Sequence, residues 1–156
     1  MSNDRRELVA DWLVIVGAIG LFISLFLPWS HQFSAAFLAE WGASDLLRGV
    51  PHDPTAWQVY ASTDVLLALL AIALVVVALK GSRRVRAGAA AAAAVGLAFT
   101  LRALSTPPTN GANIFDPSLS VPNYFPNTAT AGIGETLAVI AIVVSLIGLV
   151  LSFTAD

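Results

Sequence analysis

Four apolar runs, each close to 20 residues long, constrain the fold of this chain more than any other feature. They extend over about residues 8–28, 59–79, 87–104 and 132–153. An α-helix rises about 1.5 Å per residue, so each run forms a helix of about 27–33 Å, which matches a hydrocarbon core of roughly 30 Å. Because lipid offers no hydrogen bonds to the backbone, each run is predicted to be a membrane-spanning helix.

Composition supports this fold class and excludes several others. Of the 156 residues, 57% are hydrophobic and 12% are charged, whereas soluble domains carry about 25% charged residues. The length leaves room for one transmembrane domain, residues 1–156, with outer segments 29–58 and 105–131. The net charge of −2 does not favour nucleic acid as a partner. The absence of cysteine excludes disulfides and thiolate metal sites.

The distribution of lysine and arginine predicts the orientation. The positively charged residues next to one end of the runs are Arg5, Arg6, Lys80, Arg83, Arg84 and Arg86. The other side has only Arg48 and Arg102. Because positive loops stay in the cytoplasm, both termini are predicted to be cytoplasmic, and the fold is an antiparallel four-helix transmembrane bundle. Trp12, Trp29 and Trp57 lie at run boundaries, where they are expected to anchor the helices at the headgroup level.

The first outer segment contains a short helical pattern. Phe33, Phe37 and Trp41 recur at every fourth position, which places them on one face of an amphipathic helix. This outer cap either covers the helix ends as a lid or forms a surface that docks a partner or gates a ligand. The second outer segment is rich in proline and is predicted to be an irregular loop that packs on the first through apolar residues such as Phe115 and Tyr124.

Three charged residues within the runs are candidate functional residues, because charge is costly inside a membrane. Asp64 lies 16 residues before Lys80, and Arg102 lies 16 residues after Arg86. Sixteen helical residues span about 24 Å, so Asp64 and Arg102 are predicted to lie at one level. Glu135, near the outer end of the last run, reaches a similar level.

This candidate charge layer of Asp64, Arg102 and Glu135 allows three interpretations. It forms an interhelical ion pair, or its members reach separately to outer water, or it serves as a proton or ion relay or a polar ligand pocket. Tyr60 and Thr63 lie beside Asp64 in the sequence and could complete the layer.

Catalytic motifs are missing from the sequence. It contains no glycine-rich phosphate loop, no His-Glu-x-x-His and no Gly-x-Ser-x-Gly. His31 and His52 have no metal-binding spacing. We therefore expect no catalytic residues, no metal site, no cofactor and no enzyme activity.

Two short motifs carry a resemblance. Leu27-Pro28-Trp29 ends the first run, and Trp57-Gln58-Val59-Tyr60, followed by Asp64, begins the second. The chain thereby resembles small four-helix integral membrane proteins of high-GC actinobacteria. The resemblance implies a four-helix fold and a bacterial inner-membrane location, and it implies no specific activity.

The leading functional hypothesis is a non-catalytic integral membrane protein, an accessory or structural component that acts through helix packing and its outer cap. The alternative is a small transporter or channel component that uses the charge layer. The expected partners are the lipid bilayer and either another membrane protein or a second copy of the chain.

Overall fold

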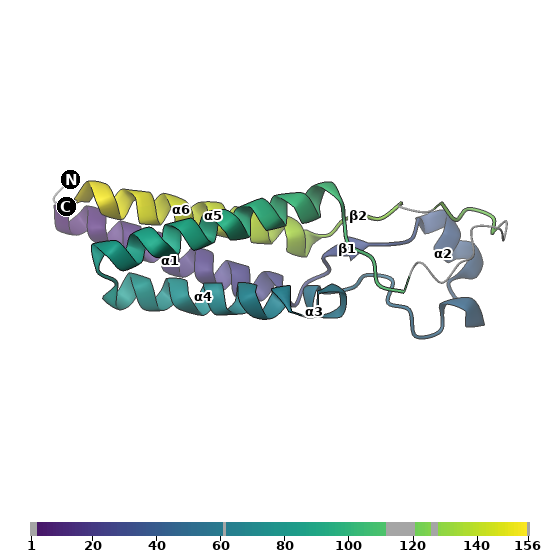
Figure 1. Ribbon diagram of the computed structural model, residues 1–156. Helices are drawn as coiled ribbons and strands as arrows, with labels where there is room; N and C mark the ends of the chain where they lie inside the picture. The colour runs from purple at the N-terminus through teal and green to yellow at the C-terminus, as the bar shows by residue number, and fades with distance from the viewer. Residues whose placement is uncertain (1–2, 61, 112–120, 126–127, 156) are drawn as a thin grey trace.

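Four long helices dominate the computed structural model, which describes residues 3–60, 62–111, 121–125 and 128–155 (Figure 1). They are α1 (Asn3–Ser24), α4 (Thr63–Lys80), α5 (Arg83–Ser105) and α6 (Ile133–Ala155). Each is long and apolar enough to cross a membrane. Figure 1 places both termini and the turn between α4 and α5 at one end of the helices. We call this the terminal end, and the opposite end the head end.

The helices pack lengthwise, and each has two close neighbours. Helix α1 contacts α4 and α6, while α5 contacts the same two helices from the other side. The α1–α6 contact is the most extensive, and small residues explain it. A Cβ added to Gly17 would lie 2.5 Å from the carbonyl oxygen of Ala141, and one added to Gly148 would lie 2.6 Å from that of Ala10. The two backbones can approach this closely only where side chains are absent.

Large apolar side chains also cover the outside of the four helices. Leu66 is 64% exposed, Leu79 is 66% exposed and Val95 is 72% exposed. A helix that is apolar on every face is typical of a membrane span or of a helix buried in a large core. The helices thus bury one apolar face against one another and present a second apolar face outward.

An ionic contact joins two helices at the terminal end. The guanidinium of Arg86 on α5 lies 3.2 Å from the carboxylate of Asp11 on α1 and 3.8 Å from that of Glu7. The same guanidinium donates a hydrogen bond to the carbonyl oxygen of Gly81. Arg86 therefore connects the α4–α5 turn to α1.

The described residues between the long helices at the head end form an extension of the bundle, which we call the head (Figure 1). Its short elements are β1 (Ser30–His31), α2 (Ala35–Trp41), a 3₁₀ turn η1 (Asp45–Leu47), α3 (Ala56–Val59) and β2 (Thr130–Ala131). β1 and β2 pair antiparallel, with Ser30 opposite Ala131. Pro28 forms an isolated bridge with Thr55. The head is thus hydrogen-bonded to the chain just before α6.

Helix α2 confirms a short helix in the first outer segment, but Phe33, which was predicted to share its apolar face, precedes the helix. Its first turn is capped by the hydroxyl of Ser34, which accepts a hydrogen bond from the backbone N–H of Phe37 at 3.1 Å. Phe33 and Phe37 are buried with Leu47, and Trp41 packs against them. The predicted apolar face therefore points into the head itself.

The prediction that the second outer segment packs on the first can be checked only in part. Phe115 lies outside the described residues. Tyr124 does pack on the first segment, because its ring lies 5.5 Å from that of Phe37. The structure adds the β1–β2 pairing, which the sequence did not predict. Two paired residues per strand are too few to leave a periodic pattern.

Candidate functional site

Two acidic side chains are buried inside the four helices near the head end. Asp64 lies in the first turn of α4 and Glu135 in the first turn of α6. Both residues have 0% exposure, and none of their four carboxylate oxygens has a hydrogen-bond partner in the described part of the chain. The positive end of a helix dipole favours a carboxylate in the first turn, but it does not replace a counterion.

The packing around Gly96 on α5 sets the levels of these two carboxylates. A Cβ added there would lie 3.6 Å from Ile142 of α6 and 3.8 Å from Leu67 of α4. Asp64 is three residues, about one turn, closer to the head than Leu67. Glu135 is seven residues, about two turns, closer to the head than Ile142. The two acids therefore lie about one helical turn apart along the bundle.

Arg102 does not form the ion pair with the two acids that one interpretation of the predicted charge layer required. Its level is as expected, in the last turn of α5, but the residue is exposed and forms no ion pair with any described carboxylate. The inward face of this turn is occupied by Thr100 and Ala103, which are buried. Because successive helical residues are rotated by about 100°, Arg102 points away from that face. The structure brings the two acids into the interior without the arginine.

Tyr60 lies beside both buried acids. Burial raises the pKa of its phenol above the ordinary value of 10.0, and the negative charges of Glu135 and Asp64 raise it further. Its ring contacts Trp29 at 5.9 Å and Phe99 at 5.2 Å, both edge-on. Aromatic neighbours on two sides thus hold Tyr60 between α3 and α4.

A recess opens next to Tyr60 at the head end. It has a volume of about 630 Å³. Its wall consists of Val59, Tyr60, Ser105, Thr106, Pro107, Pro108, Thr109 and Ala129. Neither Asp64 nor Glu135 lines it, so Tyr60 is the wall residue that also lies within electrostatic reach of the two acids. Thr63 is half-buried and lines a separate groove between α4 and α5.

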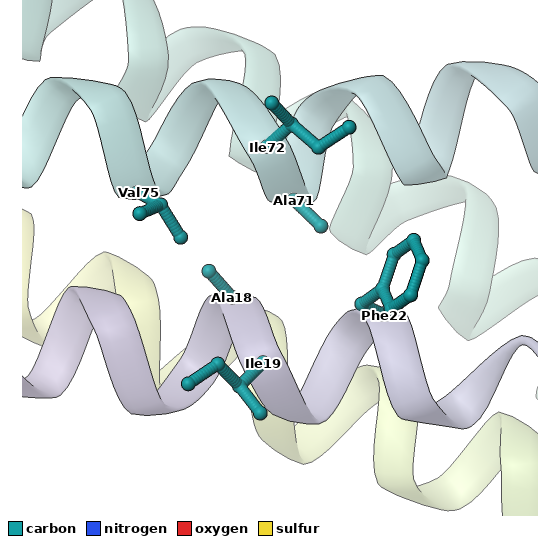
Figure 2. Close-up of a pocket in the computed structure, with 6 residues that line it drawn as sticks. All are labelled: Ala18, Ile19, Phe22, Ala71, Ile72 and Val75. Carbon is teal, nitrogen blue, oxygen red and sulfur yellow. The ribbon is translucent and has the colours of Figure 1, made fainter.

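The groove between α1 and α4 is apolar, unlike the recess beside Tyr60. Figure 2 shows this groove, lined by Ala18, Ile19, Phe22, Ala71, Ile72 and Val75. Its volume is about 250 Å³, and every side chain in its lining is a hydrocarbon. Such a groove fits an acyl chain and offers nothing to a polar ligand. The two buried carboxylates lie outside this groove, near the head end.

The three predicted tryptophan anchors have different environments. Trp12 is 59% exposed and Trp57 is exposed, so both rings remain available for the predicted anchoring role. Trp29 is instead completely buried, and its indole Nε1 donates a 2.9 Å hydrogen bond to the carbonyl oxygen of Ser24. A Cβ on Gly134 would lie 2.6 Å from the Trp29 ring. Trp29 therefore packs against the start of α6 and does not anchor the chain in headgroups.

Two buried hydroxyl groups in the interior of the four helices were not predicted from the sequence. Ser24 on α1 and Thr100 on α5 are both fully buried. Each donates to a carbonyl oxygen of its own helix, Ser24 to Leu21 and Thr100 to Leu97, so their lone pairs remain available as acceptors. Thr100 lies one turn closer to the head than Gly96, which is the level of Asp64. Serine and threonine are common within apolar helical runs, so Ser24 and Thr100 could not be recognised from the sequence as residues of the interior.

A second polar cluster fastens the head. The amide of Gln32, which is almost fully buried, donates to the carbonyl oxygens of Pro51 and Asn110. Its own oxygen accepts a 2.7 Å hydrogen bond from the backbone N–H of Asn110. One glutamine thus joins the first head segment to the chain that follows α5.

Both histidines lie in the head, and neither belongs to a metal-binding group of described residues. His31 pairs with Asp53 at 2.5 Å, and His52 packs edge-on against Phe33. Among the described residues, no group of three or more histidine, cysteine or acidic side chains could hold a metal ion. The buried acids are therefore a pair, and any cation bound there would need neutral oxygens as its other ligands.

Comparison with known proteins gives no family assignment. No protein-family model, no curated protein and no solved structure matches this chain.

Proposed function

We propose that this chain is a non-catalytic integral membrane protein of the bacterial inner membrane, an accessory or structural component that presents its head on the outer side. The observation that carries the proposal is the hydrogen-bonded attachment of the head to the helix ends. Gly132 and Gly134 donate backbone hydrogen bonds to Trp29 and Pro28, each at 2.8 Å. The head and the start of α6 therefore move together, as a docking element must.

The distribution of charge supports an orientation for this proposal. The six cations near the terminal end and the positive-inside tendency favour both termini and the α4–α5 turn in the cytoplasm. The head then faces outward. Its exposed acidic side chains, such as Asp45 and Asp53, would meet a partner outside the membrane, and the basic turn would not.

A crosslinking experiment tests the accessory role. A photoreactive residue replaces Leu46, an exposed head residue, or Ser82, the matched position in the terminal turn. After illumination in native membranes and purification in nanodiscs, mass spectrometry identifies the crosslinked proteins. The proposal expects one stoichiometric partner from position 46 that position 82 does not capture. If the protein purifies alone, with no crosslinked partner at either position, the accessory role is contradicted.

A transport role is the second candidate, and the buried acids favour it. Asp64 and Glu135 are charged groups of the kind that mark ion pathways in membrane helices. The test is cation flux into liposomes for the wild-type protein and for Asp64→Asn and Glu135→Gln. A transporter loses flux in both variants while retaining its fold. Equal flux in all three proteins, or no flux above empty liposomes, counts against transport.

A further inference from the structure

The charge around Asp64 and Glu135 is not balanced by any described side chain. Arg102 is exposed, Arg48 pairs with Asp45 on the head, and Arg86 pairs with Asp11 at the terminal end. Two carboxylates that are shielded from water and unpaired would be strongly unfavourable. A folded chain that retains both acids inside therefore needs positive charge from solution.

The neighbouring groups are oxygens of the kind that hard cations prefer. The phenol of Tyr60 lies near both acids. The buried hydroxyl of Thr100 lies level with Asp64. Mg²⁺ and Ca²⁺ bind carboxylate, hydroxyl, carbonyl and water oxygens. The environment contains no described thiol or imidazole, so it does not suit a softer metal ion.

The spacing and the charge of the pair indicate the kind of ion. The levels of Asp64 and Glu135 differ by about one helical turn along the bundle axis, and both side chains are buried near the Tyr60 phenol. Two carboxylates carry two negative charges, which a divalent cation neutralises. The recess of about 630 Å³ has Tyr60 in its wall and provides a path from solution.

We propose that Asp64 and Glu135, together with the oxygen of Tyr60, form a binding site for one hard divalent cation, Ca²⁺ or Mg²⁺, inside the head end of the bundle. The site connects α4 and α6 across the interior, so the bound cation fixes the head end of the helices. This inference goes beyond the accessory role and does not depend on it. It concerns binding and holds whether or not ions cross the membrane.

The first experiment measures stabilisation of the whole protein in nanodiscs. After treatment with EDTA, the melting temperature is followed while Ca²⁺, Mg²⁺ or K⁺ is added. The proposal expects a saturable rise with Ca²⁺ or Mg²⁺ at concentrations where K⁺ has no effect. Asp64→Asn and Glu135→Gln should each weaken binding about tenfold or more. The control Asp45→Asn removes an exposed head acid and should leave the response unchanged.

The second experiment covers the case in which neither variant folds. Tb³⁺ replaces Ca²⁺, and its emission is excited through the rings of Trp29 and Tyr60 in the wild-type chain. Sensitised emission that Ca²⁺ displaces, and that falls in Tyr60→Phe, supports the site. Absence of sensitised emission overturns it. The proposal is also overturned if divalent cations leave the melting temperature unchanged while Asp64→Asn and Glu135→Gln are more stable than wild type, since protons then neutralise the acids.

Discussion

At the scale of single residues, glycine has opposite roles at two positions in the long helices. A Cβ at Gly17 would lie 2.2 Å from the hydroxyl oxygen of Ser145, whereas one at Gly88 would meet nothing within 4 Å. Gly17 permits the close approach of α1 and α6, and Gly88 lies on the exposed face of α5. The same substitution should therefore have opposite effects at the two sites.

Gly17→Ala should lower the free energy of unfolding by about 1–3 kcal/mol, because the added methyl group forces α1 away from α6. Gly88→Ala should raise it by up to about 1 kcal/mol, since alanine favours the helix and has open space. Reversible unfolding in micelles measures both. Equal effects of the two substitutions would show that α1 and α6 do not pack as described.

Tyr60 reports the charge of the buried acids. Its pKa is raised by burial and by Glu135 and Asp64, so Asp64→Asn should move the phenol pKa back toward 10.0. Alkaline absorbance titration in a Tyr124→Phe background isolates the signal, because the chain has two tyrosines. Glu40→Gln, a change in the distant α2, is the control. An unchanged titration in Asp64→Asn would mean that Asp64 carries no negative charge in the folded chain.

The same raised pKa has a consequence for stability. The folded chain retains the Tyr60 proton at a pH where the unfolded chain has begun to release it. The contribution of Tyr60 to stability is therefore fully present below pH 10 and declines as the pH rises from 10 toward the folded pKa.

At the scale of elements, the head depends on one side chain that joins its parts. Gln32→Leu leaves the backbone N–H of Asn110 and the carbonyl of Pro51 without their partner, at a cost of about 1–3 kcal/mol for a buried unpaired group. The head should loosen while the long helices stay folded. Trypsin should then cut faster after Arg48, which lies in the head.

The control for this prediction is Gln58→Ala. Gln58 accepts one hydrogen bond from the backbone of Thr55 and is exposed, so its loss should have little effect on cleavage after Arg48. Faster cleavage throughout the chain in Gln32→Leu would indicate global unfolding and contradict a local role.

At the scale of the whole molecule, the shared position of the termini and the α4–α5 turn makes orientation testable. The chain has no cysteine, so a single introduced thiol is specific. A membrane-impermeant maleimide added to intact cells should label Asp45→Cys in the head and leave Ser82→Cys unlabelled until the cells are lysed. Labelling of Ser82→Cys in intact cells would reverse the proposed orientation.

The sequence predicted the number and approximate lengths of the long helices, because apolar run length is a property of consecutive residues. The predicted bounds 8–28 and 87–104 were wrong, since α1 extends over Asn3–Ser24 and α5 over Arg83–Ser105. It also predicted the level of Arg102 from residue counts. It could not predict which way Arg102 points, because rotation about the axis of α5 depends on how Thr100 and Ala103 pack on other helices. For the same reason, the sequence could not show that Asp64 and Glu135 both lack a partner for their carboxylates, because this depends on which side chains surround them.

The start of α4 and the role of Trp29 were also predicted incorrectly from local patterns. The second run was predicted to begin at residue 59, but α4 begins at Thr63 because α3 ends at Val59 and Tyr60 is extended. Trp29 was interpreted from its place at the end of a run, and only tertiary packing reveals that it is buried. Local patterns therefore determine where helices form, and long-range contacts determine which side chains meet.

The extensive packing of α1 on α6 has a consequence for biosynthesis. The ribosome makes α1 first and α6 last, and β2 follows β1 by about a hundred residues. A nascent chain that has formed only α1, α4 and α5 still has no partner for the glycine face of α1 and no second strand to pair with β1. The described fold can therefore be completed only once α6 has been made, and a chain that lacks α6 exposes the features by which proteases recognise an unfinished protein.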